Sequence, residues 1–253
     1  MKVWLKCLRL PICILASLLV IASFRVVTKE IPWQAVLATF FITSATILQN
    51  DWRDRFHDAR KGKMLALQHQ KAFITWTITY WAMSGGLIVL AVLHDHAIGV
   101  VLALTAIVGL VYSETRKIPL VPIMLVSLCS ATAVTLPIVV GGNSEKLWLM
   151  SLSVFCIIFA REIMKDLEDA YLDRGYKWTF PLRIGERHSK TLATVTPVMG
   201  SAVAIKVSLA ALLGVPFILV AAILLVRGGG PSTSKMVLDA GMTLIILALI
   251  TFG

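Results

Sequence analysis

Long apolar runs, separated by short polar stretches, dominate the chain. A membrane-spanning helix needs about 20 mostly apolar residues, and the pattern predicts nine such spans. They are Leu10–Val27, Trp33–Gln49, Phe73–Leu93, Ala97–Ser113, Pro119–Gly141, Leu147–Ile163, Leu192–Ala204, Val207–Val226 and Met236–Phe252. Residues 192–226 form one apolar stretch with Lys206 in its middle. We divide it there, because a single helix of that length would overshoot a hydrocarbon core of about 30 Å.

The composition agrees with this pattern and excludes two classes of protein. Hydrophobic residues make up 58% of the 253 residues, charged residues 15%, and the mean hydropathy is +0.84. Soluble domains are about 45–50% apolar and about 25% charged, so neither a soluble enzyme nor a disordered chain is expected. The prediction is an all-α polytopic membrane protein with about nine helices, forming a single integral membrane domain over residues 1–253.

Basic residues outnumber acidic ones, 24 to 14, which gives a net charge of +10. They lie between the apolar runs, so they indicate topology and contact with anionic lipid headgroups rather than nucleic acid. With the N-terminus in the cytoplasm of a plasma or inner membrane, only Arg25, Lys29, Lys146 and Lys206 fall outside. The long charged loops 51–71 and 164–190 are then cytoplasmic, and nine spans place the C-terminus outside.

Two acidic clusters stand where predicted spans end on the inner side. The first runs from Asn50 to Asp58 with the pattern N-D-x-x-D-x-x-x-D. The second runs from Asp166 to Asp173 and repeats the spacing D-x-x-D-x-x-x-D. On a helix, positions i, i+3 and i+7 share one face, so each cluster would bring three carboxylates together. Like charges so placed need a cation, which makes both clusters candidate metal sites.

Carboxylate oxygens suit Mg²⁺, which is usually held by a few protein carboxylates together with the phosphate oxygens of a substrate. Basic side chains near both clusters can contact phosphate directly; they are Arg60, Lys63, Lys117, Arg161, Lys165 and Lys177. The apolar spans offer room for a long hydrocarbon tail. A diphosphate head at the rim and an apolar tail in the bundle describe a prenyl diphosphate.

These motifs resemble those of the UbiA superfamily of intramembrane prenyltransferases. The first cluster matches the N-D-x-x-D-x-x-x-D of that superfamily. The second, with Arg161, Glu162 and Lys165 ahead of Asp166, is similar to the R-E-I-x-K-D-x-E-D of the geranylgeranylglyceryl phosphate geranylgeranyltransferase branch. Tyr112-Ser113 with Lys117 resembles a Y-S-x-x-x-K element of the family.

The resemblance implies nine helices around a central cavity and Mg²⁺-dependent transfer of a prenyl group. Catalysis would centre on Asp51, Asp54, Asp166 and Asp169. The implied metal ligands are Asp51, Asp54 and Asp58 at one site and Asp166, Asp169 and Asp173 at the other. The implied substrate-binding residues are Asn50, Arg60, Tyr112, Lys117, Arg161 and Lys165.

The expected donor is a polyprenyl diphosphate, geranylgeranyl diphosphate in the first instance. The expected acceptor is a lipid or small molecule that is hydrophobic or phosphorylated, such as geranylgeranylglyceryl phosphate. Two alternatives remain open at this stage. An aromatic acceptor would make the protein an enzyme of quinone or meroterpenoid synthesis. A transporter is the non-enzyme alternative, although transporter acids usually lie near the bilayer midplane.

Overall fold

The computed structural model describes residues 9–252, apart from 63, 116–117 and 143, and this part of the chain folds into helices without strands. Each of the nine predicted spans is largely helical, although two of them combine an α-helix with a 3₁₀ turn. Four of these helices are long and apolar enough to cross a membrane by themselves: Gln70–His94, Val121–Val140, Glu145–Asp173 and Pro231–Phe252. The all-α fold is therefore confirmed, whereas the number of spans stays a prediction.

Contacts between Cα atoms divide the chain into two compact units, residues 1–20 with 31–115 and residues 21–30 with 116–253. Helix α2 (Leu10–Val26) contributes to both units. The assignment of one membrane domain to the whole chain stays a prediction.

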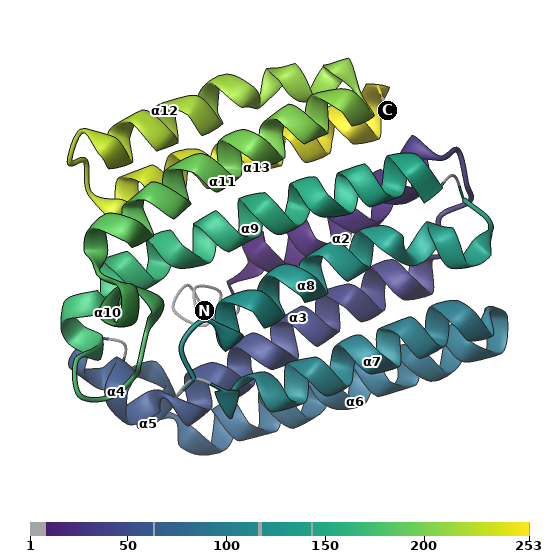
Figure 1. Cartoon of the computed structure of the whole chain (residues 1–253). Helices are drawn as coiled ribbons and strands as arrows, with labels where there is room; N and C mark the ends of the chain where they lie inside the picture. Colours follow the sequence, from purple (N-terminus) through teal and green to yellow (C-terminus); the bar gives the residue numbers. More distant parts are fainter. Residues whose placement is uncertain (1–8, 63, 116–117, 143, 253) are drawn as a thin grey trace. The chain divides into compact units, whose positions relative to one another are not determined.

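The first unit is built on three long helices, α3 (Trp33–Arg53), α6 (Gln70–His94) and α7 (His96–Tyr112), which pack on one another (Figure 1). Short helices α4 (Arg55–Arg60) and α5 (Leu65–Gln68) join α3 to α6. Asp95 separates α6 from α7 and caps α7, because its carboxylate accepts a hydrogen bond from the Ile98 backbone N–H at 3.1 Å.

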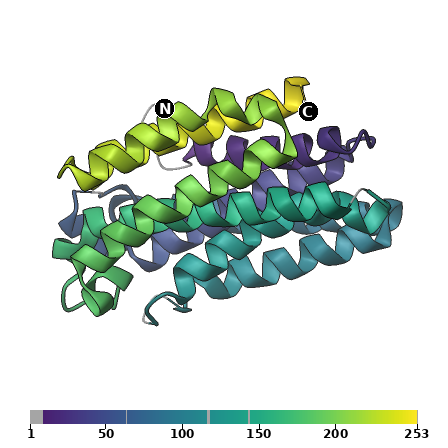
Figure 2. The same cartoon turned by 45° about the horizontal axis from the view of Figure 1, so that its top comes forward.

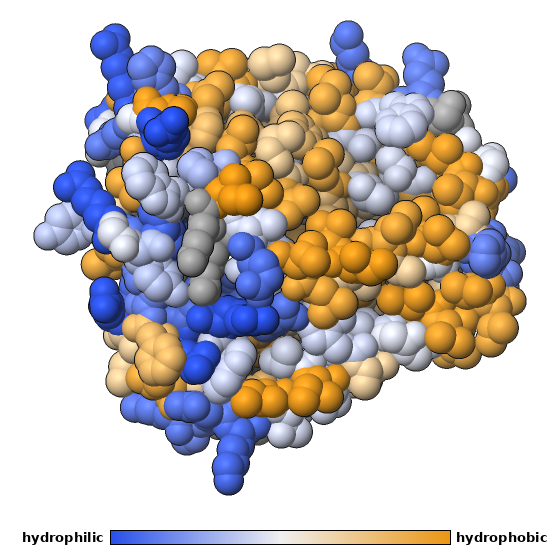
Figure 3. All heavy atoms as spheres, turned by 60° about the horizontal axis from the view of Figure 1, so that its bottom comes forward, coloured by the Kyte–Doolittle hydropathy of each residue, from blue (hydrophilic) through white to orange (hydrophobic). Residues whose placement is uncertain are grey.

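Gln49 links the three long helices of this unit through its side-chain amide. It accepts a hydrogen bond from the Trp81 indole N–H at 2.9 Å and donates one to the Leu110 carbonyl at 2.8 Å. Near the C-terminal end of α3, Leu48 packs with Ala66 and Phe73 in a buried cluster. These contacts hold the end of α3, where the first acidic motif begins. Large hydrophobic side chains remain exposed on α6 and α7, as expected of helices that face lipid (Figure 3).

The second unit is organised around α9 (Ser144–Asp173), which packs against α8 (Val121–Thr135), α11 (Glu186–Val207) and α13 (Pro231–Phe252). Helix α12 (Val215–Val226) lies beside α13 (Figure 2). The 3₁₀ turns η2 (Leu136–Val140) and η3 (Leu209–Leu213) follow α8 and α11, and the short helix α10 (Phe180–Ile184) precedes α11. The end of α11 at Val207 confirms the predicted break beside Lys206.

Glycines allow the closest backbone approaches of this unit. A Cβ atom at Gly214 would lie 2.3 Å from the Gly241 carbonyl oxygen, so the start of α12 and the middle of α13 meet without an intervening side chain. A Cβ atom at Gly200 would lie 2.9 Å from the Ser153 carbonyl oxygen, which sets the spacing of α11 and α9. Small residues serve this purpose where helices pack inside a membrane.

Helix α9 is longer than a bilayer requires. Its 30 residues extend about 45 Å at 1.5 Å per residue, against a hydrocarbon core of about 30 Å. Its apolar stretch, Leu147–Ile163, lies in the first two thirds of the helix. The last third is polar and carries the second acidic motif beyond the apolar layer.

Candidate active site

The first acidic motif lies where α3 gives way to α4, within the first unit. The helix is interrupted at Asp54, whose φ of −90° and ψ of 3° end α3 before α4 begins at Arg55. The helix on which the predicted shared face depends is therefore interrupted within the motif, and the shared face of Asp51, Asp54 and Asp58 stays a prediction. All three are nevertheless buried, because backbone hydrogen bonds from Asp54 to Asn50 and from Asp58 to Asp54 keep the helical turn spacing through the interruption.

Asp51 is held by a cation that the sequence did not single out for this role. The Arg9 guanidinium forms an ion pair with it, with 2.9 Å between Nη2 and Oδ1. Arg9 is 42 residues away and stands just ahead of the first predicted span. The pair places a positive charge at the first carboxylate of the motif, which offsets the repulsion among three buried acids.

The other predicted substrate-binding residues of this part of the chain differ in exposure. Asn50 is half-buried at the end of α3, and Tyr112 is half-buried at the end of α7. Arg60 is exposed at the end of α4, where its side chain meets solvent or headgroups. Lys117 and Lys63 lie outside the described residues.

The second motif follows the predicted geometry more closely. Residues 161–173 belong to the unbroken helix α9, so Asp166, Asp169 and Asp173 share one side of it. Asp166 and Asp169 are half-buried and Asp173 is buried. Glu168, between them in sequence, points to the other side and pairs with Lys235 of α13. The backbone of Phe180, at the start of α10, hydrogen-bonds to Asp166 and so ties the following loop to the motif.

Arg161 and Lys165, the predicted phosphate-binding cations of α9, are joined through Glu162. The Glu162 carboxylate accepts hydrogen bonds from Arg161 Nη1 at 2.7 Å and from Lys165 Nζ at 3.0 Å. Its side chain is only 8% exposed, so both cations gather at a nearly water-free carboxylate. Arg161 also reaches Asp239 of α13. Asp239 is a single acid in a mostly apolar run and belongs to no motif, so it could not be predicted from the sequence.

The donor set of both motifs suits a hard divalent cation. In the described part of the chain, no group of three or more His, Cys, Asp or Glu side chains forms a preformed metal cage. Mg²⁺ does not need one, because it retains several waters and commonly takes one or two protein carboxylates together with substrate phosphate oxygens. The buried or half-buried carboxylates at 51, 54, 58, 166, 169 and 173 fit that mode of binding. The two motifs belong to different compact units, and their joint action stays a prediction.

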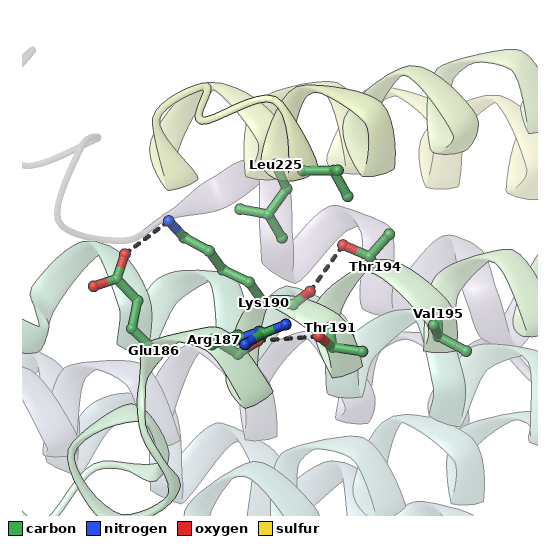
Figure 4. A pocket seen from close by; sticks show the side chains of 8 residues that line it. Glu186, Arg187, Lys190, Thr191, Thr194, Val195 and Leu225 are labelled. Atoms are coloured by element: carbon green, nitrogen blue, oxygen red, sulfur yellow. Dashed lines mark hydrogen bonds and ion pairs between the residues drawn. The ribbon is translucent and has the colours of Figure 1, made fainter.

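A cavity of about 610 Å³ lies between α11 and α12 of the second unit (Figure 4). Its lining comprises Glu186, Arg187, Lys190, Thr191, Thr194, Val195, Leu225 and Val226. A hydrogen bond from Lys190, 2.7 Å away, lowers the pKa of Glu186. Both threonine hydroxyls donate to carbonyls one turn earlier on α11. All of these lining residues belong to α11 and α12, so the cavity is separate from the acidic motifs.

One family model matches the chain, and several solved structures share its fold. The model of the UbiA prenyltransferase family matches residues 10–232. Among solved structures, a digeranylgeranylglyceryl phosphate synthase is 19% identical, with a TM-score of 0.71 over 99% of this chain and 97% of that one. A UbiA homologue from Aeropyrum pernix K1 is 12% identical, with a TM-score of 0.80 over 96% and 98%. One from Archaeoglobus fulgidus, bound to GPP and Mg²⁺, is 16% identical, with a TM-score of 0.70 over 98% of each chain. A search of curated proteins gave no significant match.

Proposed function

Since the chain belongs to the UbiA prenyltransferase family and is an integral membrane prenyltransferase, we propose that it uses Mg²⁺ to transfer a polyprenyl group from its diphosphate to a lipid acceptor. The proposed donor is geranylgeranyl diphosphate, and the proposed acceptor is geranylgeranylglyceryl phosphate. The observation that carries the proposal is the second motif. Three carboxylates share one side of α9, just beyond its apolar part, and Arg161 and Lys165 precede them on the same helix.

Each motif has a defined part in this proposal. Asp51, Asp54 and Asp58, with Asn50 beside them, would hold one Mg²⁺; Asp166, Asp169 and Asp173 would hold a second. When bound, Mg²⁺ supplies positive charge that stabilises the departing diphosphate. The acids are buried or half-buried, so they would act in surroundings where electrostatic interactions are stronger than in water.

Basic side chains of the protein would bind the diphosphate directly, in addition to Mg²⁺. Arg161 and Lys165 are proposed to donate hydrogen bonds to its oxygens, and Arg60, Tyr112 and Lys117 are proposed to contact it as well. Donors fixed in place before the reaction stabilise a leaving diphosphate without reorganising during bond cleavage. The allylic C–O bond then breaks and its electron pair leaves with the diphosphate. The acceptor hydroxyl oxygen attacks C1 of the prenyl chain and its proton passes to the released diphosphate, while the apolar surroundings exclude water.

Two findings support the choice of acceptor. The R-E-I-x-K-D-x-E-D pattern of α9 resembles the branch that prenylates geranylgeranylglyceryl phosphate. A digeranylgeranylglyceryl phosphate synthase is among the solved structures of the same fold. The Archaeoglobus fulgidus homologue bound to GPP and Mg²⁺ supports the diphosphate donor and the metal.

We also propose that the N-terminus and both motif-bearing loops face the cytoplasm and the C-terminus faces outward. The support is the excess of Lys and Arg on that side of the predicted spans. Single cysteines at Arg60 and Lys146, introduced into a cysteine-free protein, would test it in sealed inverted vesicles. A membrane-impermeant maleimide should label position 60 and spare position 146, and the opposite pattern would reverse the topology.

The activity test uses purified protein in detergent with geranylgeranyl diphosphate, Mg²⁺ and one of three acceptors: geranylgeranylglyceryl phosphate, 4-hydroxybenzoate or a naphthoate. Products are identified by mass spectrometry, and released diphosphate is measured in parallel. The expected result is one Mg²⁺-dependent product, formed with geranylgeranylglyceryl phosphate.

Matched variants make the test specific for the motifs. Asp51→Asn and Asp166→Asn should each lower the rate by about 100-fold or more, the scale seen when a charge-stabilising group is removed. Glu186→Gln changes an exposed acid of the same unit as Asp166 and should keep the wild-type rate. A product with an aromatic acceptor alone would replace the proposed acceptor. No product and no diphosphate release with donors of any length would contradict prenyl transfer.

A further inference from the structure

Arg161 of α9 is held across the helix pair by Asp239 of α13, a residue of neither acidic motif. The Arg161 Nε–H donates a hydrogen bond to Asp239 Oδ1 at 2.7 Å, and Arg161 Nη2 donates one to Asp239 Oδ2 at 3.3 Å. The two bonds make a bidentate arrangement, which fixes the plane of the guanidinium as well as its position. The Arg161 side chain is 12% exposed and the Asp239 side chain is 30% exposed, so the contact is only partly open to water.

The remaining donors of Arg161 can be counted. A guanidinium has five N–H groups. Asp239 takes one from Nε and one from Nη2, and Glu162 takes one from Nη1. One N–H on Nη1 and one on Nη2 therefore remain, in the plane that the three bonds define. Two N–H groups of one guanidinium plane match a pair of phosphate oxygens.

Asp239 is an ionisable residue within a mostly apolar helix, where a charged side chain is energetically unfavourable. Helix α13 is one of the four helices long and apolar enough to cross a membrane, and Asp239 stands nine residues into it, with an apolar run after it. Acids inside such helices are rare and, by default, point to function. Together with Arg161, Glu162 and Lys165 it forms a four-member network of two acids and two bases. The charges of these four side chains cancel, which lowers the cost of placing Asp239 in an apolar helix.

The helix pair has a second ion pair that can serve as a comparison. Lys235, one turn before Asp239 on α13, pairs with Glu168 on α9. This pair joins the same two helices but includes none of the proposed phosphate-binding residues. If Asp239 only joined α13 to α9, loss of either ion pair would lower the melting temperature and leave the affinity for diphosphate unchanged.

We propose that Asp239 is a positioning residue for the diphosphate, orienting Arg161 so that its two remaining N–H groups face the diphosphate oxygens. This inference rests on the proposed function, because it takes Arg161 to be a diphosphate ligand. Asp239 does not touch the substrate. It acts through Arg161, whose plane it sets before the substrate arrives, and so it reduces the reorganisation needed on binding.

The test is the affinity for inorganic diphosphate with Mg²⁺, measured by isothermal titration calorimetry on the full-length protein in detergent. Asp239→Asn keeps the shape of the side chain but removes its charge and one acceptor oxygen. It should weaken diphosphate binding about 10- to 100-fold, the range expected for hydrogen bonds to charged groups. The KM for the prenyl diphosphate should rise in parallel. Lys235→Met should change the diphosphate affinity less than about twofold, whatever it does to the melting temperature.

A double-mutant cycle separates positioning from fastening. Lysine cannot form the bidentate contact, so in an Arg161→Lys background Asp239→Asn should have no further effect on diphosphate affinity. The inference is overturned if Asp239→Asn lowers only the melting temperature. It is also overturned if Asp239→Asn weakens binding equally in the wild-type background and in the Arg161→Lys background. Wild-type protein that binds diphosphate but transfers no prenyl group would refute the proposed function alone. Wild-type protein that binds no diphosphate would refute both.

Discussion

Burial, rather than distance, should decide how much a Glu–Lys pair stabilises this protein, and two pairs within one unit allow the comparison. Glu162 pairs with Lys165 at 3.0 Å, three residues along α9. Glu186 pairs with Lys190 at 2.7 Å, four residues along α11. The Glu162 side chain is 8% exposed, whereas that of Glu186 is 72% exposed. The same substitution, Glu→Gln, can be made in both.

The expected magnitudes differ by several fold. Glu162→Gln removes the buried anion that Arg161 and Lys165 share. The expected cost is about 3 kcal/mol, the lower end for a broken buried pair, because Arg161 keeps Asp239 and Lys165 is 33% exposed. Glu186→Gln breaks an exposed pair within a helix, which is worth about 0.3–0.5 kcal/mol. For a chain of this size, about 1 kcal/mol shifts the melting temperature by about 2–4 °C.

Thermal unfolding in detergent, followed by tryptophan fluorescence, measures both variants under one set of conditions. Glu162→Gln should lower the melting temperature by about 6 °C or more, and Glu186→Gln by no more than about 2 °C. Raising the salt concentration should reduce the melting-temperature shift of Glu186→Gln. It should leave the shift of Glu162→Gln nearly unchanged, because salt screens buried pairs poorly. Equal shifts for the two variants would refute the reasoning that burial controls these pairs.

Two further predictions concern packing. Gly214→Ala should destabilise the protein by about 1–3 kcal/mol, because the new Cβ would lie 2.3 Å from the Gly241 carbonyl oxygen and only backbone movement can relieve the contact. Gly86→Ala, in the middle of α6 with nothing within 4 Å of the new Cβ, should be neutral or stabilising in the same melting experiment; equal losses would contradict the packing account. Gln49→Leu should cost about 1–3 kcal/mol, because it leaves the Trp81 indole N–H unpaired between helices. A blue shift of tryptophan emission should accompany the loss, and unchanged emission and stability would show that the Gln49 bonds contribute nothing.

Sequence periodicity and composition were sufficient for the fold class, because each long apolar run became a helix. The second motif was also predictable. Residues 161–173 contain no Gly or Pro, so the helix continues and the i, i+3, i+7 spacing becomes a shared side. The interruption at Asp54 was not predictable, because the residues around it are ordinary in helices and the turn depends on the local backbone.

The long-range pairs were beyond sequence reasoning for a different reason. Asp239 is 78 residues from Arg161, and Arg9 is 42 residues from Asp51. Neither pair follows a helical or strand period. Each depends on which helices pack together and at what rotation, and hydrophobic runs of similar composition do not specify that. The sequence therefore predicts the residues of the chemistry, whereas the structure shows which residues pair with two of them.

The excess length of α9 links the enzyme to the composition of its membrane. A bilayer settles around the apolar part of a helix, and a mismatch is relieved by tilting the helix or by thinning or thickening the lipid around it. Asp166 and Asp173 belong to the same continuous helix as that apolar part. Their depth relative to the headgroups therefore changes with the thickness of the bilayer. Longer acyl chains would draw these carboxylates toward the lipid, and shorter chains would lift them into water. Acyl-chain length thus becomes a means of tuning access to the site without any change in the protein.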